Sequence, residues 1–170
     1  ISDSTTYNFT TADTTPSFTD GNSSSVSLDE DGSLNLTSAL EVSDISSNDT
    51  LTWTVVTGPS HGSLSGIDNQ NEVVSGADSP HTLSTSPTYT PNADYNGGDS
   101  FEVQVEDNNP GVTDSITVSV TVNPVNDAPS ISIGGDQTIS DTTEQRNVSN
   151  FATGFDPGGG SDESSQNISD

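Results

Sequence analysis

Apolar residues alternate with polar ones along much of the stretch from residue 26 to residue 125. The alternation is longest at residues 116–122, where Ile or Val stands at every second position, and it recurs at residues 51–55 and 101–105. Side chains of a β-strand point alternately to opposite faces, so a period of two predicts strands with one buried face. Helical periodicity is nowhere convincing, and the chain is therefore predicted to be all-β.

Turn-forming dipeptides separate the expected strands, including Asp31-Gly32, Gly58-Pro59 and Gly97-Gly98. Short strands at this spacing are typical of antiparallel sandwiches and barrels. Leu, Ile, Val and Phe occupy only 34 of the 170 positions, but 24 of those 34 lie within residues 26–125. We therefore expect one domain, residues 26–125, to build the hydrophobic core.

The segments on either side of that domain differ from it in composition. Residues 1–25 contain 13 Ser or Thr, which predicts a linker, or the end of a preceding repeat, with little regular structure. Residues 126–129 break the strand pattern and are expected to link two repeats. Residues 130–170 restart the alternation at Ile131 but offer no obvious return strand, so they are expected to be the truncated start of a next repeat.

The net charge of the chain limits which kinds of partner it can bind. One Lys or Arg (Arg146) stands against 26 Asp and Glu, a formal net charge of -25. Nucleic acids and anionic membranes are polyanions and are therefore unfavourable partners, whereas cations are favoured. The absence of Cys excludes disulfides and thiolate metal sites. No apolar run is long enough to insert into a membrane, and a start at Ile1 without Met is expected of a segment cut from a longer protein.

Three segments resemble a known family: Asp29–Gly32, Tyr89–Phe101 and Val122–Pro129. With the run at residues 57–64, they look like the cadherin-like tandem repeats of very large bacterial surface proteins and adhesins, over Val26–Pro129. The resemblance implies an immunoglobulin-like Greek-key β-sandwich of about seven strands, with calcium (Ca2+) between successive repeats. It also implies a secreted or cell-surface spacer or adhesive module, whose partners are neighbouring repeats and a cell-surface glycan or protein.

Calcium is also indicated by the residues themselves. Asp29 and Asp31 are two positions apart, so on an extended strand both carboxylates would face the same way. Two carboxylates held close together cannot both stay ionised at low cost unless a cation lies between them, and a hard divalent ion with oxygen ligands meets this need. The alternative is a solvated acidic turn before Gly32, because exposed like charges cost only tenths of a kcal/mol.

The resemblance implies one calcium site at the lower end of the repeat. Cadherin-like pairs share calcium between the end of one domain, the linker and the loops of the next domain. By this resemblance the lower ligands would be Glu30, Asn126 and Asp127. Asp156 and Asp162 would complete the site from the following module.

The resemblance implies a second site at the upper end. Asp44 and Asp107 would be its ligands, and Asp49 is a weaker candidate.

Ser46 stands where related repeats often have the second Asp of an Asp-x-Asp pair, and Asn123 stands where animal cadherins usually have Asp. Each change removes a charged oxygen ligand, so weaker or fewer ions are expected.

Two further signals receive non-catalytic interpretations. Residues 58–62 match the G-x-S-x-G pattern of the hydrolase nucleophile elbow, but that elbow joins a strand to a helix, and strand-like sequence lies on both sides here. We expect a hairpin turn and no enzyme activity. His61 and His81, the two histidines of the chain, are expected to be turn and loop residues rather than a metal-binding pair.

The rival function is an accessory β-sandwich that binds carbohydrate for a secreted enzyme. Such a domain needs two or three exposed aromatic side chains on one face, and the candidates are Tyr89, Tyr95 and Trp53. Trp53 alternates with Leu51 and Val55, so it is expected to pack in the core rather than to stack on a sugar.

Overall fold

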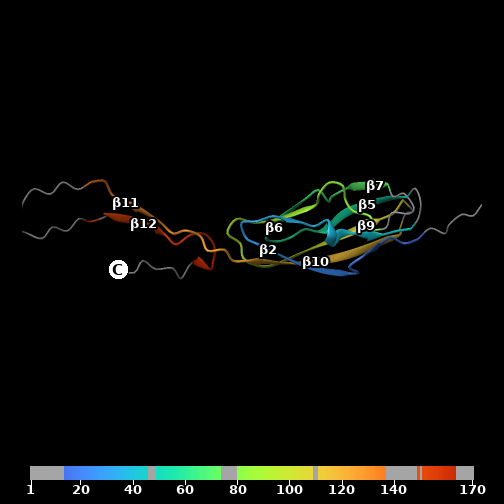
Figure 1. The fold of residues 1–170 in the computed structure, drawn as a ribbon, viewed down its shortest axis with the longest axis horizontal. Coiled ribbons are helices and arrows are strands. Elements are labelled where there is room, and N and C mark those ends of the chain that lie inside the picture. Colours follow the sequence, from blue (N-terminus) through green and yellow to red (C-terminus); the bar gives the residue numbers. More distant parts are fainter. Residues whose placement is uncertain are drawn as a thin grey trace, which may run out of the picture.

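The computed structural model is an all-β sandwich followed by a hairpin (Figure 1). It describes residues 14–45, 49–73, 80–108, 111–136, 149 and 151–163. Within these ranges one complete 3-10 turn is described, Ser38–Leu40. No helix in this described part is long and apolar enough to cross a membrane. The predicted all-β fold class is confirmed.

The larger sheet has five strands. In spatial order they are β2 (Ser23–Asp29), β10 (Thr113–Asn123), β9 (Gly97–Glu106), β5 (Thr50–Thr57) and β7 (Gln70–Val73). Side chains of β10 alternate between buried and exposed from its fourth residue onward, as the period of two predicts. The sheet is not wholly antiparallel, because β2 pairs with β10 in parallel.

Shorter strands form the opposite layer. One three-stranded sheet has the order β3 (Leu34–Asn35), β8 (Thr88–Pro91) and β6 (Gly62–Ser65). A two-stranded sheet joins β1 (Ser17–Phe18) to β4 (Val42–Ser43). The described sandwich therefore has ten strands rather than about seven, and three of them, β1, β3 and β4, have only two residues each.

The core lies between these layers. Trp53 is fully buried at its centre, and its indole Nε1 donates a hydrogen bond to the backbone oxygen of Leu40 at 3.3 Å. The predicted core role of Trp53 is thus confirmed. The buried cluster consists of Phe18, Leu28, Leu36, Leu40, Val42, Leu51, Trp53, Ile67, Leu83, Tyr89, Phe101, Val103, Val105, Ile116, Val118, Val120 and Val122.

The sandwich begins earlier than the sequence pattern indicates. Phe18 is 3% exposed and belongs to the core, although it lies in the segment expected to be a linker. Its backbone N donates a hydrogen bond to Asp114 Oδ2 at 2.8 Å, which ties β1 to β10. The expected boundary at Val26 falls inside β2. Phe18 has no apolar residue at an alternate position on either side, so no period in the sequence indicates its burial.

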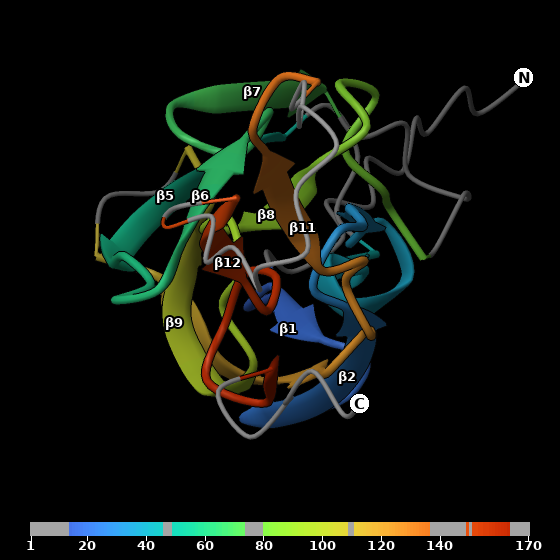
Figure 2. The same cartoon turned by 90° about the vertical axis from the view of Figure 1, so that its left-hand side faces the viewer.

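Residues after the linker form a two-stranded hairpin at one end of the sandwich (Figures 1 and 2). Its strands, β11 (Ser130–Ile133) and β12 (Ala152–Asp156), pair antiparallel. The expectation of no return strand after residue 130 was therefore wrong. Both strands are exposed throughout, but β11 has Ile at alternate positions, whereas β12 has no apolar alternation. The sequence pattern therefore did not reveal β12.

Candidate functional site

Strand direction brings several loops to the end of the sandwich that faces the hairpin. β2 and β10 both end there, with Asp29 paired to Asn123. β9 runs antiparallel to β10 and begins at the same end, where Gly97 pairs with Val122. The residues that follow β2, precede β9 and follow β10 therefore meet. We call this region, with residues 158–163 that lie against it, the linker end.

Glu30 is the most enclosed acidic residue that the sandwich contributes to the linker end. It is 3% exposed. Its Oε1 accepts a hydrogen bond from the backbone N of Val125 at 2.7 Å, and its Oε2 accepts one from Asn96 Nδ2 at 3.3 Å. A single carboxylate therefore joins the turn after β2, the turn before β9 and the residue that precedes the linker.

The segment after β12 returns to the same place. Glu163 is 3% exposed, and its Oε1 accepts a hydrogen bond from the backbone N of Asp127 at 3.0 Å. Asn96 Nδ2 donates to Asp162 Oδ1 at 2.7 Å, while Asn96 Oδ1 accepts a hydrogen bond from Ser161 Oγ at 3.3 Å. Residues 161–163 are thus connected to both the sandwich and the linker.

Asp31 lies near other carboxylates of the linker end. Its pKa is raised above the ordinary value, first by desolvation and then by the negative charges of three neighbours: Asp127, Glu30 and Asp94. The shared strand expected for Asp29 and Asp31 is absent, because β2 ends at Asp29. The chain then turns, with Gly32 N donating to the backbone oxygen of Asp29 at 2.9 Å. The turn directs Asp31 toward the linker-end carboxylates instead of aligning it with Asp29.

The other residues expected at the lower site, Asp29, Asn126 and Asp156, each have a different hydrogen-bond partner. Asp29 Oδ1 accepts a hydrogen bond from Asn123 Nδ2 at 3.3 Å, and the Nδ2 of Asn126 donates to the backbone oxygen of Asp127 at 3.1 Å. Asp156 ends β12, and its Oδ1 accepts a hydrogen bond from Gly158 N at 3.2 Å. Of the two completions expected from the following module, Asp162 has a hydrogen bond to the sandwich.

Sequence reasoning missed three residues of the linker end: Asp94, Asn96 and Glu163. The first two lie inside the 89–101 motif that carried the family resemblance, but they were not singled out as ligands. Their position immediately before β9 is the signal that would have found them, because β9 begins beside the linker. Glu163 stands in a Ser- and Asp-rich tail without periodicity, and no local signal distinguishes it.

The predicted upper residues lie at the opposite end. Asp44 is 2% exposed and accepts a hydrogen bond from Thr14 Oγ1 at 2.8 Å. Asp107 is 4% exposed and follows β9, with its backbone N donating to the oxygen of Val112 at 3.3 Å. Asp49 precedes β5, and its Oδ2 is buried and accepts no hydrogen bond from the described residues. All three are acids with restricted access to water.

Neither end presents a finished metal centre. Within the described ranges, no three or more His, Cys, Asp or Glu side chains stand close enough together to hold a metal ion as they are. The acidic and amide side chains of the linker end nevertheless offer carboxylate and amide oxygens as ligands, the donor chemistry that calcium prefers. The ligand atoms of the linker end therefore suit calcium in their chemistry but not in their spacing. An ion would have to draw the carboxylates closer together.

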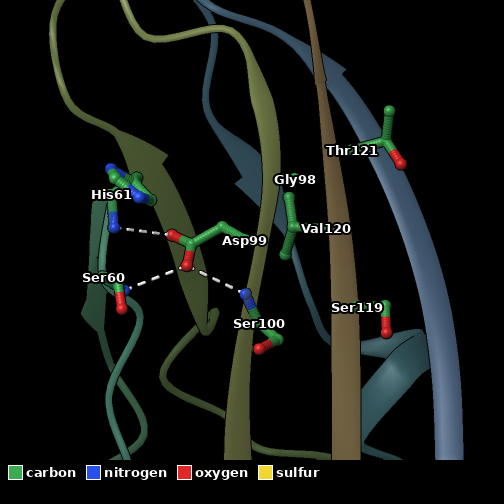
Figure 3. Close-up of a pocket in the computed structure, with 8 residues that line it drawn as sticks. All are labelled: Ser60, His61, Gly98, Asp99, Ser100, Ser119, Val120 and Thr121. Carbon is green, nitrogen blue, oxygen red and sulfur yellow. Dashed lines mark hydrogen bonds between the residues drawn. The ribbon is translucent and has the colours of Figure 1, made fainter.

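Asp99 organises a different part of the sandwich (Figure 3). Its carboxylate accepts hydrogen bonds, each 2.9 Å long, from four donors: the backbone N of Ser60, His61 and Ser100, and the hydroxyl of Tyr89. Desolvation acts to raise the pKa of Asp99, but these hydrogen bonds lower it below the ordinary value. The same contact and burial raise the pKa of Tyr89, with burial the larger cause.

These contacts show what the G-x-S-x-G run does. β5 ends at Thr57 and β6 begins at Gly62, so the run joins two strands. The expected hairpin is absent, because β5 and β6 belong to different sheets and β6 pairs with β8. An open hollow of about 560 Å³ lies beside it (Figure 3). In this turn Ser60 and His61 use their backbone N–H groups to bind Asp99. The carboxylate therefore holds the turn against β9.

Both histidines and the candidate aromatic side chains make contacts within the sandwich. His61 stacks on Tyr95 with ring centroids 4.2 Å apart, and His81 Nε2 lies 2.9 Å from the backbone oxygen of Asp44. Trp53 and Tyr89 are fully buried. Two of the three aromatic side chains that the carbohydrate-binding alternative requires are therefore inaccessible to a sugar.

Comparison with known proteins identifies a family whose model matches most of this chain. Residues 13–121 match the family model described as "Bacterial Ig domain". A stretch of 79 residues is 33% identical to integrin beta-like protein C of Dictyostelium discoideum, and it covers 46% of this chain but only 4% of that protein. A similar solved structure is the ASH / PapD-like domain (PapD-like domain 7) of human CEP192, at 15% identity and a TM-score of 0.39, covering 74% of this chain and 98% of that chain.

Proposed function

Because the chain belongs to the bacterial Ig domain family, we propose that it is a spacer or adhesive module whose junction with the following segment is stiffened by calcium. Domains of this family are typical of surface and secreted bacterial proteins. The cadherin-like motifs in the sequence support the finer proposal. So does the convergence of acidic groups from both sides of the linker.

The observation that carries the proposal is a pair of buried carboxylates on opposite sides of residues 126–129. Glu30 and Glu163 are each 3% exposed. The chain has one Lys or Arg, Arg146, which lies outside the described residues. In the described part, therefore, no Lys or Arg side chain neutralises Glu30 or Glu163. A buried carboxylate without a countercharge costs several kcal/mol. A bound divalent cation would supply that countercharge.

Calcium would also explain why like charges gather at the linker end of the sandwich. Desolvation, followed by the negative charges of Asp127, Glu30 and Asp94, raises the pKa of Asp31. Oxygen ligands at Glu30, Asp127 and Asp162 come from the sandwich, the linker and the returning segment. An ion shared among these residues would link three pieces of chain and restrict their relative motion, which is what a load-bearing or extended repeat protein needs.

The test compares melting temperatures in calcium and in sodium at equal ionic strength, because sodium also screens repulsion. For a dissociation constant of about 0.1–1 mM, calcium at 100 times that value adds about 2.7 kcal/mol of stability per site. Replacing Glu30→Gln together with Asp127→Asn should remove this calcium-specific gain. Asp68→Asn with Glu102→Gln is the matched control, since it removes two charges away from the linker end and should keep the gain.

Two results would count against the proposal. One is equal melting temperatures of the unmodified chain in the two salts. The other is an equal calcium-specific gain in both double variants, which would place the ion somewhere other than at Glu30 and Asp127.

A further inference from the structure

Three consecutive glycines of the linker end, Gly158–Gly160, lie directly against Asp94 and Asp127. A Cβ atom added to Gly158 would stand 2.7 Å from Cβ of Asp127, and one added to Gly159 would stand 2.2 Å from the carboxylate of Asp94. A Cβ on Gly160 would lie 3.1 Å from the backbone oxygen of Asp94. Gly158 and Gly160 also have φ angles of 114° and 84°, which favour glycine. The contact therefore depends on the absence of side chains.

Polar contacts continue this apposition beyond the glycines. Asn96 is hydrogen-bonded on one side to Glu30 of the sandwich and on the other to Asp162 and Ser161 of the returning segment. The backbone N of Asp127 donates to Glu163. Glycine packing and three hydrogen bonds thus act on one short stretch of chain, residues 158–163.

We propose that residues 158–163 form a docking turn that fixes the direction in which the hairpin leaves the sandwich. The hairpin strand β11 begins three residues after Asp127, and β12 ends at Asp156, just before the glycines. A segment joined to its neighbour by one linker can rotate about it. The hairpin is held at a second point, through the docking turn, and a second attachment removes that rotation.

This inference differs from the proposed calcium function in what it requires. It rests on glycine contacts and on the amide of Asn96, none of which supplies a charged ligand. Asp162 and Glu163 approach Asp94 and Asp127, so like charges oppose docking. Calcium would assist docking by relieving that repulsion, but the glycines decide whether the turn fits.

The backbone amide of Asp127 provides a direct probe, because its hydrogen-bond partner is Glu163 of the docking turn. The amide of Val125 serves as an internal reference, because its partner, Glu30, belongs to the sandwich. Hydrogen exchange of both amides is measured by NMR in the whole chain, in calcium and in EDTA. Fluorescence of Trp53, which is buried in the core, verifies that each variant keeps a folded sandwich.

Gly158→Ala should speed exchange at Asp127 by about tenfold or more in calcium, because a non-glycine residue at positive φ is disfavoured and its Cβ meets Asp127. Exchange at Val125 should be unchanged. Asn96→Asp, which replaces the donor with a third carboxylate, should have the same effect. Gly58→Ala is the matched control, since its added Cβ has no neighbour within 4 Å, and it should leave both amides unchanged.

The proposal is overturned if Gly158→Ala leaves the exchange of Asp127 at its original rate, or if that amide is unprotected in the unmodified chain. A failure of the calcium proposal looks different. The Asp127 amide would then be equally protected in calcium and EDTA, while Gly158→Ala would still release it.

Discussion

Replacing Asp99 with Asn would disturb the contact that holds the β5–β6 turn against β9. One carboxylate oxygen accepts hydrogen bonds from the backbone N of Ser60 and Ser100, and the other accepts from His61 N and the hydroxyl of Tyr89. Asn has one oxygen and one NH2 group in the same positions. Whichever way the amide is oriented, its NH2 group faces two groups that now donate.

The expected cost follows from this count of hydrogen bonds. A typical intramolecular hydrogen bond contributes about 1 kcal/mol net, so two lost bonds predict a loss of about 2 kcal/mol in the free energy of unfolding. Asp99 is partly exposed, and water reduces the additional contribution of its charge. Tyr89 can rotate its hydroxyl to accept from the amide, which would bring the loss toward about 1 kcal/mol.

The dependence on pH identifies the carboxylate as the cause. Because the folded pKa of Asp99 is lowered, its contribution to stability is fully present above the unfolded pKa of about 3.9 and is lost as the pH falls through the lower folded value. The difference between the unmodified chain and Asp99→Asn should therefore be largest near neutral pH and shrink in acid. Urea denaturation followed by Trp53 fluorescence measures it at each pH. A difference that is absent at neutral pH, or that grows in acid, would refute this reasoning.

Three further outcomes test the fold and the interpretation of the turn. Trp53→Ala should destabilise the sandwich by about 3–5 kcal/mol in urea denaturation followed by circular dichroism, whereas a loss under about 1 kcal/mol would mean that the ring is not a core residue. A fragment of residues 14–125 should melt at a higher temperature than one of residues 26–125, because only the longer fragment keeps Phe18; equal melting temperatures would contradict its place in the core. Ser60 should not react with a fluorophosphonate probe, as judged by intact mass, and stoichiometric labelling would overturn the interpretation of the turn as structural.

The sequence was sufficient to predict the strands whose faces differ. Residues 51–55, 101–105 and 116–122 became parts of β5, β9 and β10, because each strand has a core face and an outer face. The parallel pairing of β2 could not be predicted in this way, since parallel and antiparallel strands share the same period. The strand β12 was missed because its residues do not alternate between apolar and polar.

The candidate site was predictable only where residues lie inside a motif. Glu30 and Asp127 were recognised from the segments that resemble cadherin-like repeats, and the structure places both at the linker end. The roles of Asn96 and Glu163 arise from contacts between residues 66 and 36 positions apart, respectively. Such contacts depend on where β9 begins and where the chain returns after β12, and no local pattern contains that information.

A calcium titration followed by two-dimensional NMR tests the central claim most directly, because it reports on each amide separately. The account predicts that the amide signals of Asn96, Asp127 and Glu163 shift together and saturate with one dissociation constant of about 0.1–1 mM. The amide of Ser60, whose partner is Asp99, should stay in place. Shifts that do not saturate, or a saturating response that leaves these three amides unmoved, would contradict a calcium site at the linker end.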